Sequence, residues 1–307
     1  MKILITGSSG FVGKYLVDHI SLQKNDNIQI YGLVHSHLLE NTDKIKYFEC
    51  DLTDYHEIFS IIRKIHPDII IHLAGIRGDD LHSLLDVNVK GTKNLFNAVV
   101  SSNINSLFLV FGSSAEYGYA GEDPISEEAA LKPLTNYGIS KVAEILLALS
   151  YHQRFGLPVV IFRPFNIIGP GQSPDFVIGN ILRQVNEFEE GKRTSLELNT
   201  LDSRRDFIDV RDVVWAIWKI INHPDFAHVC AGNIFNIGSG RNYSIKEILK
   251  LLEEITSKNY PVRYLKNYST RNDIPSQVAD IRKIQEIINF SPFFPIQKSL
   301  RDMYYSK

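Results

Sequence analysis

Cysteine is scarce in this sequence, with only Cys50 and Cys230 among 307 residues. Two cysteines so far apart do not make the disulfide framework of a small secreted domain. We therefore expect both to be reduced thiols in a cytoplasmic protein. The histidines at His35 and His37 have no cysteine or carboxylate at ligand spacing, so we expect no metal site.

The chain also lacks a long hydrophobic run and a surplus of one charge. No apolar stretch approaches the length of a membrane span, and the first apolar segment starts at residue 2, so we expect neither a membrane anchor nor a signal peptide. The 33 basic and 35 acidic side chains give a formal net charge of −2, which argues against a nucleic-acid partner. With 44% apolar residues, the chain can bury one large core or two modest ones.

What is present in the first half is an alternation of short apolar runs with helical patterns. Such alternation predicts an α/β fold with a Rossmann-like, doubly wound parallel sheet and helices on both faces. We expect strands at 2–6, 28–34, 45–49, 68–73, 106–112 and 158–163. We expect helices near 11–23, 54–65, 80–102 and 137–154.

The first expected strand runs directly into Gly7, Gly10 and Gly13, and a helical pattern follows. In a strand–turn–helix unit the first glycine permits a tight turn, the second lets backbone approach a pyrophosphate, and the third lets helix and strand pack closely. The helix N-terminus then offers N–H groups to the phosphates. The pattern predicts a dinucleotide site, and an ordinary strand-to-helix turn is the alternative.

The second expected strand ends at His35, where an NAD-preferring site often carries a carboxylate for the ribose 2′-hydroxyl. A histidine tolerates a 2′-phosphate, so we favour NADP(H), with NAD(H) as the other choice. Two solvated loop histidines would give the same sequence.

After a turn-rich stretch at 169–174 the chain changes character. We expect a helix near 176–190, sheet-like sequence at 207–210 and 233–237, and a helix at 244–256. This predicts a dinucleotide-binding domain formed by 1–166 and 206–240. A smaller, discontinuous C-terminal lobe formed by 167–205 and 241–307 would bind the substrate.

Tyr137 and Lys141 are four residues apart in an expected helix and therefore share one face. An ammonium beside a phenol stabilises the phenolate and lowers the pKa of the phenol from its usual value of about 10. Such a phenol can exchange a proton with a carbonyl oxygen, and Ser113 can add a hydrogen bond to the same oxygen. A surface tyrosine beside a solvated lysine is the alternative interpretation.

Further motifs occur in order along the chain: Asp51-Leu52, His72-Leu73-Ala74-Gly75, Asn88-Val89-Lys90-Gly91-Thr92, Arg163-Pro164-Phe165-Asn166 and Arg205-Asp206-Phe207-Ile208-Asp209-Val210. With the glycine turn and the Ser113, Tyr137 and Lys141 set, they make the whole chain resemble the extended short-chain dehydrogenase/reductase family of nucleotide-sugar enzymes. Segments 112–118 and 169–177 look most like the GDP-4-keto-6-deoxy-D-mannose reductases of that family, which form GDP-D-rhamnose.

The resemblance implies a role for each motif. Ser113, Tyr137 and Lys141 would be catalytic, with Tyr137 protonating the C4 oxygen as the nicotinamide delivers hydride. The residues expected to bind the cofactor are Gly7, Ser9, Gly10, Phe11, Val12, Gly13, His35, Asp51, Leu52, Leu73, Ala74, Gly75, Asn88, Tyr137, Lys141 and Pro164. Those expected to bind the GDP-linked 4-keto-6-deoxy sugar are Ser114, Glu116, Asn166, Ser173, Asp175, Arg183, Arg205 and Arg271.

A reductase is favoured over a dehydratase of the same family. The dehydratases carry Asp-Glu or Ser-Glu directly after the catalytic Ser/Thr, and those two positions are Ser114 and Ala115 here. Alanine transfers no proton. If the segment is extended, Glu116 points to the opposite face from Ala115.

A 4-epimerase with retained NAD is the alternative enzyme, and a dinucleotide-sensing regulator is a distant third. A 6-deoxyheptose or 6-deoxytalose product is a variant of the first interpretation.

Two arginines are candidates for the nucleotide end of the substrate. Arg205 is favoured as a diphosphate contact because a guanidinium suits phosphate geometry, whereas a solvated charged loop is the competing interpretation. Arg271 stands one residue after the place where the family often has an arginine, which is Thr270 here.

The stretch 142–149 is apolar almost all round, which indicates burial on more than one side. Core packing and a subunit interface explain it equally well. We expect a homodimer through the helices near 80–102 and 137–154.

Overall fold

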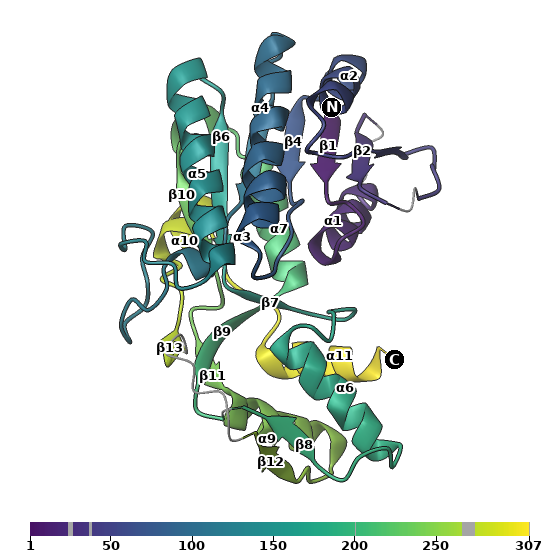
Figure 1. The fold of residues 1–307 in the computed structure, drawn as a ribbon, viewed down its shortest axis with the longest axis vertical. Helices are drawn as coiled ribbons and strands as arrows, with labels where there is room; N and C mark the ends of the chain where they lie inside the picture. Colours follow the sequence, from purple (N-terminus) through teal and green to yellow (C-terminus); the bar gives the residue numbers. More distant parts are fainter. Residues whose placement is uncertain (24–26, 37–38, 200, 266–273, 307) are drawn as a thin grey trace.

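A computed structural model describes residues 1–23, 27–36, 39–199, 201–265 and 274–306. It has two lobes, a larger one built on a sheet and a smaller one below it in Figure 1. The N-terminus lies in the larger lobe and the C-terminal helix in the smaller one (Figure 1).

Seven strands form the sheet of the larger lobe in the order β10-β6-β5-β4-β1-β2-β3, and all their pairings are parallel. The interior strands are apolar and buried along nearly their whole length, as expected where helices cover both faces. The predicted doubly wound sheet is therefore confirmed. The strands are β1 (Lys2–Thr6), β2 (Gln29–Val34), β3 (Ile45–Glu49), β4 (Ile69–His72), β5 (Leu107–Phe111), β6 (Val159–Pro164) and β10 (Ile234–Ile237).

Successive side chains of the strands pack under different helices. Ile3 and Ile5 of β1 join one core cluster, and Leu4 between them joins the other. The first cluster lies under α1 and α7, and the second lies under α2, α4 and α5 (Figure 1). These helices are α1 (Phe11–Ser21), α2 (Tyr55–Ile65), α4 (Gly91–Ser101), α5 (Asn136–Phe155) and α7 (Val210–Ile221).

Two elements of the structure have other bounds than the sequence predicted. The single helix expected at 80–102 is divided into α3 (Leu81–Leu84), a π-helical segment η1 (Leu85–Lys90) and α4. The strand expected at 207–210 begins earlier, as β9 (Arg204–Asp209), and ends where Asp209 caps α7 by accepting a hydrogen bond from the Arg211 nitrogen. The helix α7 was not predicted.

The smaller lobe has its own sheet and core. Strand β9 pairs with β7, β11 and β13, and β8 pairs with β12. Buried apolar residues of α6, α9 and α11 form the third core cluster. The elements are β7 (Asn166–Ile168), α6 (Val177–Glu189), β8 (Leu196–Leu198), β11 (Asn242–Ser244), α9 (Ile245–Thr256), β12 (Val262–Tyr264), β13 (Ser276–Gln277) and α11 (Ile296–Tyr305).

The chain crosses between the lobes more often than the two predicted blocks imply. Strand β9 belongs to the smaller sheet, whereas β10 is an edge strand of the larger one, on which α8 (Phe226–Val229) and α10 (Arg282–Ile288) pack. Ile284 and Phe290 are buried in the same cluster as Ile3. The exact domain boundaries stay a prediction.

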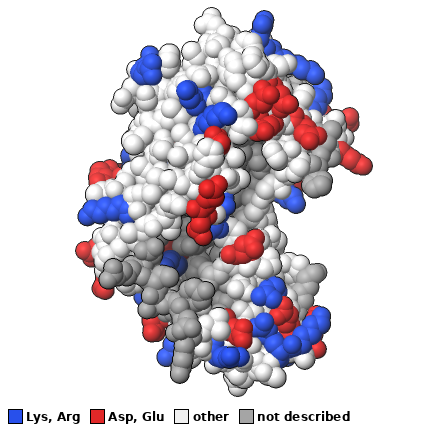
Figure 2. All heavy atoms as spheres, viewed as in Figure 1, with Lys and Arg blue, Asp and Glu red and all other residues white. Residues whose placement is uncertain are grey.

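Cys50 and Cys230 are both free and buried, as expected. No helix in the described part of the chain is long and apolar enough to cross a bilayer. On the face shown in Figure 2, basic and acidic side chains are interspersed over both lobes.

Candidate active site

The glycine turn between β1 and α1 has the geometry that the sequence predicted. Gly7 has a φ of +67°, and a Cβ there would lie 2.9 Å from the Ala74 nitrogen. A Cβ at Gly13 would lie 2.2 Å from the Gly7 carbonyl oxygen. Gly10 precedes the helix, and no side chain caps it. The first N–H groups of α1 are thus open to an anion, and the crowded glycines let a pyrophosphate approach the backbone, so the turn fits a dinucleotide.

The other residues expected at the cofactor follow the carboxyl ends of parallel strands, which meet at one edge of the sheet. The Thr53 nitrogen donates to Asp51 Oδ1 over 2.8 Å, and this hydrogen bond lowers the pKa of Asp51. Around that edge lie Ser9, Phe11 and Val12 in the glycine turn and first turn of α1, His35 after β2, Asp51 and Leu52 after β3, Leu73, Ala74 and Gly75 after β4, and Pro164 at the end of β6.

The position of Asn88 differs from the cofactor contact expected for its side chain. The side chain is 1% exposed, and its Oδ1 accepts from the Ile76 nitrogen over 2.8 Å. Its Nδ2 donates to the Ile76 carbonyl and to Ser140 Oγ, each over 3.1 Å. Both amide donors are therefore used within the protein. Asn88 fastens the loop after β4 to α5.

Tyr137 and Lys141 lie in the first two turns of α5, which begins after the cap Thr135. The Thr135 hydroxyl accepts from the Gly138 nitrogen over 3.0 Å, which fixes the start of the helix directly before Tyr137. Tyr137 is half-buried and Lys141 is only 5% exposed. This burial excludes the alternative of a solvated surface lysine.

Ser113 follows β5 and lies next to the start of α5. It caps a short 3₁₀ helix, η2 (Ser114–Glu116), by accepting from the Ala115 nitrogen over 3.2 Å. Helix α5 packs directly on this turn, because a Cβ at Gly138 would lie 2.6 Å from the Ala115 carbonyl oxygen. The fold thereby brings the turn that carries Ser113 against the turn that carries Tyr137.

Glu116 is a structural residue, in contrast to the substrate contact expected for it. The segment is not extended but turns into η2, so the side chain points inward and is 0% exposed. Its Oε1 accepts from the Ser113 nitrogen and its Oε2 accepts from Arg163 Nε, each over 2.6 Å. Burial raises the pKa of Glu116, although Arg163 opposes the shift. Ser114 beside it is also buried, and its carbonyl accepts from Gln277 Nε2.

The residues expected at the sugar and nucleotide are spread over the smaller lobe. Asn166 Nδ2 donates to the Asp206 carbonyl, and Ser173 Oγ donates to Asp175 Oδ2. Arg183 lies on the exposed side of α6, bonded to Glu187 and Asn180. Arg271 lies outside the described residues.

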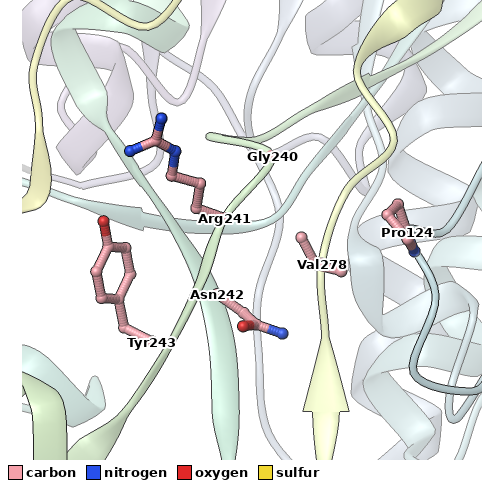
Figure 3. Close-up of a pocket in the computed structure, with 6 residues that line it drawn as sticks. All are labelled: Pro124, Gly240, Arg241, Asn242, Tyr243 and Val278. Atoms are coloured by element: carbon pink, nitrogen blue, oxygen red, sulfur yellow. The ribbon is translucent and has the colours of Figure 1, made fainter.

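Arg205 lies on a face of the smaller sheet that carries further polar groups. Tyr243 is its cross-strand neighbour on β11, and Figure 3 shows Arg241 on the same side of β11 as Tyr243, with Asn242 on the other side. A pocket of about 430 Å³ opens beside these residues, between β11, Pro124 and Val278 (Figure 3). It lies at the smaller sheet and contains none of the expected catalytic residues. The glycine turn and α5 therefore define the reaction site better than this pocket does.

Three residues that contact the catalytic residues directly or through one neighbour were not predicted. The Arg77 guanidinium carbon lies 5.6 Å from the Tyr137 ring centroid and 4.3 Å from the Phe176 ring centroid. Arg77 thus links the loop after β4 to the start of α6 in the smaller lobe. The third is Glu144, whose carboxylate bonds Lys141 Nζ over 2.7 Å. Its signal in the sequence was a single acidic residue within the apolar stretch 142–149.

Known proteins resemble this chain over its whole length. A GDP-6-deoxy-D-talose 4-dehydrogenase of Aggregatibacter actinomycetemcomitans is 30% identical, with 100% of this chain and 98% of the relative covered. A GDP-6-deoxy-D-mannose reductase of Pseudomonas aeruginosa is 29% identical, with 98% and 95% covered.

Solved structures agree in fold. The structure of RMD from Pseudomonas aeruginosa complexed with NADPH has a TM-score of 0.86 and 29% identity, with 99% of this chain and 98% of that chain covered. A UDP-glucuronic acid 4-epimerase from Bacillus cereus, in complex with UDP-glucuronic acid and NAD, has a TM-score of 0.87 and 26% identity, with 99% and 98% covered.

Residues 3–238 match the sequence model of the NAD dependent epimerase/dehydratase family. The match spans the glycine turn, the Ser113 turn and the Tyr137/Lys141 helix, which the structure brings to the same end of the sheet. The chain is a member of the NAD dependent epimerase/dehydratase family, the extended short-chain dehydrogenase/reductases.

Proposed function

We propose that this protein is an NAD(P)H-dependent reductase of the C4 ketone of a GDP-4-keto-6-deoxy-mannose-type sugar, forming GDP-D-rhamnose or a related deoxysugar such as GDP-6-deoxytalose. The two relatives that are 30% and 29% identical over the full chain are named for GDP-6-deoxy sugars. A 6-deoxyheptose product is a variant of the same proposal.

The turn that follows Ser113 carries this proposal. Elimination of water from a sugar needs an acid and a base beside the reacting carbons. Ala115 supplies neither, and both oxygens of Glu116 are occupied by Ser113 and Arg163 in a fully buried position. This turn therefore favours proton transfer to a ketone over dehydration.

Each side chain then has one task. A bound nicotinamide supplies the hydride. Tyr137 donates its phenolic proton to the oxygen that becomes an alkoxide, and the Ser113 hydroxyl donates a hydrogen bond to that oxygen as negative charge builds. Lys141 holds the ribose hydroxyls, and Arg205 binds the diphosphate from the smaller lobe.

We infer that NADPH is preferred over NADH. His35 is exposed at the end of β2, where a carboxylate would repel a 2′-phosphate. A cytoplasmic location is part of this proposal.

The direct test is to incubate the purified protein with NADPH and GDP-4-keto-6-deoxymannose and to identify the product by NMR. We expect stoichiometric loss of nicotinamide absorbance and a 4-hydroxyl product. Tyr137→Phe should lose about 10²–10⁴-fold in rate and still bind cofactor. Tyr119→Phe, at an exposed tyrosine, is the matched control. Full activity in Tyr137→Phe would refute the mechanism, and no turnover by the wild type would refute the substrate.

A nucleotide-sugar 4-epimerase with retained NAD is the second candidate, because it uses the same three groups and an epimerase shares the fold. It would interconvert sugars with catalytic cofactor and no net absorbance change. A non-catalytic dinucleotide sensor, the remaining candidate, would bind cofactor and turn over no sugar.

We also propose a homodimer through the helices near 80–102 and 137–154. Leu85, Ile139 and Leu146 expose apolar side chains there, Leu146 to 57%. Light scattering of the purified protein tests this, and a monomer at micromolar concentration would contradict it.

A further inference from the structure

Glu144 forms a buried ion pair with Lys141. The two residues are three apart in α5, and the side chains of Glu144 and Lys141 are 0% and 6% exposed. Lys141 Nζ donates to Glu144 Oε2 over 2.7 Å. An ammonium has three donors, so Glu144 takes one and leaves two for a ribose and for Tyr137. Because a buried carboxylate is costly unless it is paired, this contact fixes both side chains.

Among the residues that the structure describes, the second oxygen of Glu144 forms no ion pair with another lysine or arginine. Oε1 has no hydrogen-bond partner among the described residues, and His72 Nε2 is 3.8 Å away. Burial lowers the pKa of His72 to about 3, so the ring is neutral and this approach is not an ion pair. The ring nitrogens lie instead 2.7 Å from Thr6 Oγ1 and 2.8 Å from Thr92 Oγ1.

The titratable groups around this pair come from three elements. Tyr137 and Lys141 belong to α5, His72 to β4 and Glu116 to η2, and the loop after β4 adds Arg77, whose guanidinium carbon lies 5.6 Å from the Tyr137 ring centroid. Burial raises the pKa of Glu144 to about 7, with Lys141 opposing the shift. Burial is the largest effect on Lys141 and would lower its pKa, but Glu144, Tyr137 and Glu116 together outweigh it and the pKa is raised. The lysine therefore stays charged beside its buried counter-ion.

We propose that Glu144 is a positioning residue for Lys141: its carboxylate anchors the ammonium one turn below Tyr137 and offsets part of the positive charge that Tyr137 experiences. A ketone reduction needs Tyr137 to carry its proton, and an uncompensated ammonium favours the phenolate. The Glu144 carboxylate weakens that field at Tyr137.

The kinetic test rests on the proposed reductase function. The isosteric variant Glu144→Gln removes the charge, and we expect the alkaline limb of its kcat/KM profile for reduction to move to lower pH. Seven residues of helix separate positions 137 and 144 by about 10 Å, and a unit charge at that distance with an effective dielectric of about 20 shifts the limb by about one pH unit. An unchanged limb in a folded variant overturns the proposal.

A double-mutant cycle separates charge compensation from simple structural damage. In a Lys141→Met background the buried Glu144 loses the cation that keeps it ionised, so Glu144→Gln removes no charge there and should leave the limb in place. An equal shift in that background also overturns the proposal. If Glu144→Gln fails to fold, Glu144→Asp holds its carboxylate further from Nζ and should give a smaller shift in the same direction.

A second readout needs no substrate. The phenolate absorbance of Tyr137 can be isolated as the difference between wild type and Tyr137→Phe during an alkaline titration, and the same difference taken in the Glu144→Gln background should appear at lower pH. If the protein reduces no 4-keto sugar but this shift is present, the proposed function fails and the role of Glu144 stands. If reduction proceeds and neither shift is seen, only the role of Glu144 fails.

Discussion

Replacing Glu116 by glutamine separates the structural role of this residue from the substrate contact that its position in the sequence suggested. The new amide side chain would retain an oxygen for the Ser113 nitrogen but leave the Arg163 guanidinium, which is 2% exposed, without its counter-ion. Breaking a buried pair by removing one partner costs about 3–5 kcal/mol. With about 2.1 cal/mol/K of unfolding entropy per residue, the 307 residues have about 0.6 kcal/mol/K, so the Tm should fall by about 5–8 °C.

Thermal unfolding followed by circular dichroism measures this change. Glu128→Gln, at an exposed glutamate twelve residues further on, is the matched control and should leave the Tm within about 1 °C. The double variant Glu116→Met/Arg163→Met removes both charges and should recover much of the loss. A Tm for Glu116→Gln equal to that of the control would show that the pair contributes nothing, and the assignment of Glu116 to the scaffold would be wrong.

Three further predictions concern the cofactor turn, the pH dependence and the cofactor choice. Gly13→Ala places a Cβ 2.2 Å from the Gly7 carbonyl oxygen, so the NADPH affinity measured by fluorescence should fall at least about tenfold. An unchanged affinity would contradict the binding of NADPH at the glycine turn. Burial raises the pKa of Asp206 from 3.8 to about 6, so the stabilisation that its protonated form provides is complete below about pH 4 and is lost as the pH rises through 6. In urea unfolding from pH 4 to 7, the free energy of unfolding should therefore fall less in Asp206→Asn than in the wild type. Parallel curves for the two proteins would show that Asp206 does not cause the fall. His35→Asp should lower kcat/KM for NADPH relative to NADH by about tenfold or more, since a carboxylate repels the 2′-phosphate; an unaltered ratio would place the 2′-phosphate elsewhere.

The larger sheet could be predicted because its signals are local. The strand at residues 2–6, the three glycines after it and the helix from residue 11 follow one another without interruption, and each has its own pattern in the sequence. The smaller lobe could not be predicted in the same way. Strand β9 pairs with β7, β11 and β13, which come from distant parts of the chain, and short strands of two or three residues have no periodicity to recognise.

At the site, the sequence carries one local signal that the prediction of an outward Glu116 overlooks. Ser113-Ser114-Ala115-Glu116 has the spacing of a capping box, in which the serine and glutamate side chains bond each other's backbone nitrogens. That spacing predicts a helical turn and an inward Glu116, whereas the expected substrate contact of Glu116 does not take this turn into account. The contact of Arg77 with Tyr137 and Phe176 has no such signal, because it depends on how the two lobes meet.

The bond from Gln277 to the Ser114 carbonyl has a consequence for biosynthesis. Its donor and acceptor are 163 residues apart, and the neighbouring bonds of Ile125 with Val278 and Asp280 bind the same late segment to the region after the serine. On the ribosome, the nucleotide-binding turn and the tyrosine helix emerge long before this segment does. The nascent chain therefore contains both of these parts early, but the turn after Ser113 gains its hydrogen bond from Gln277 only when synthesis is nearly finished.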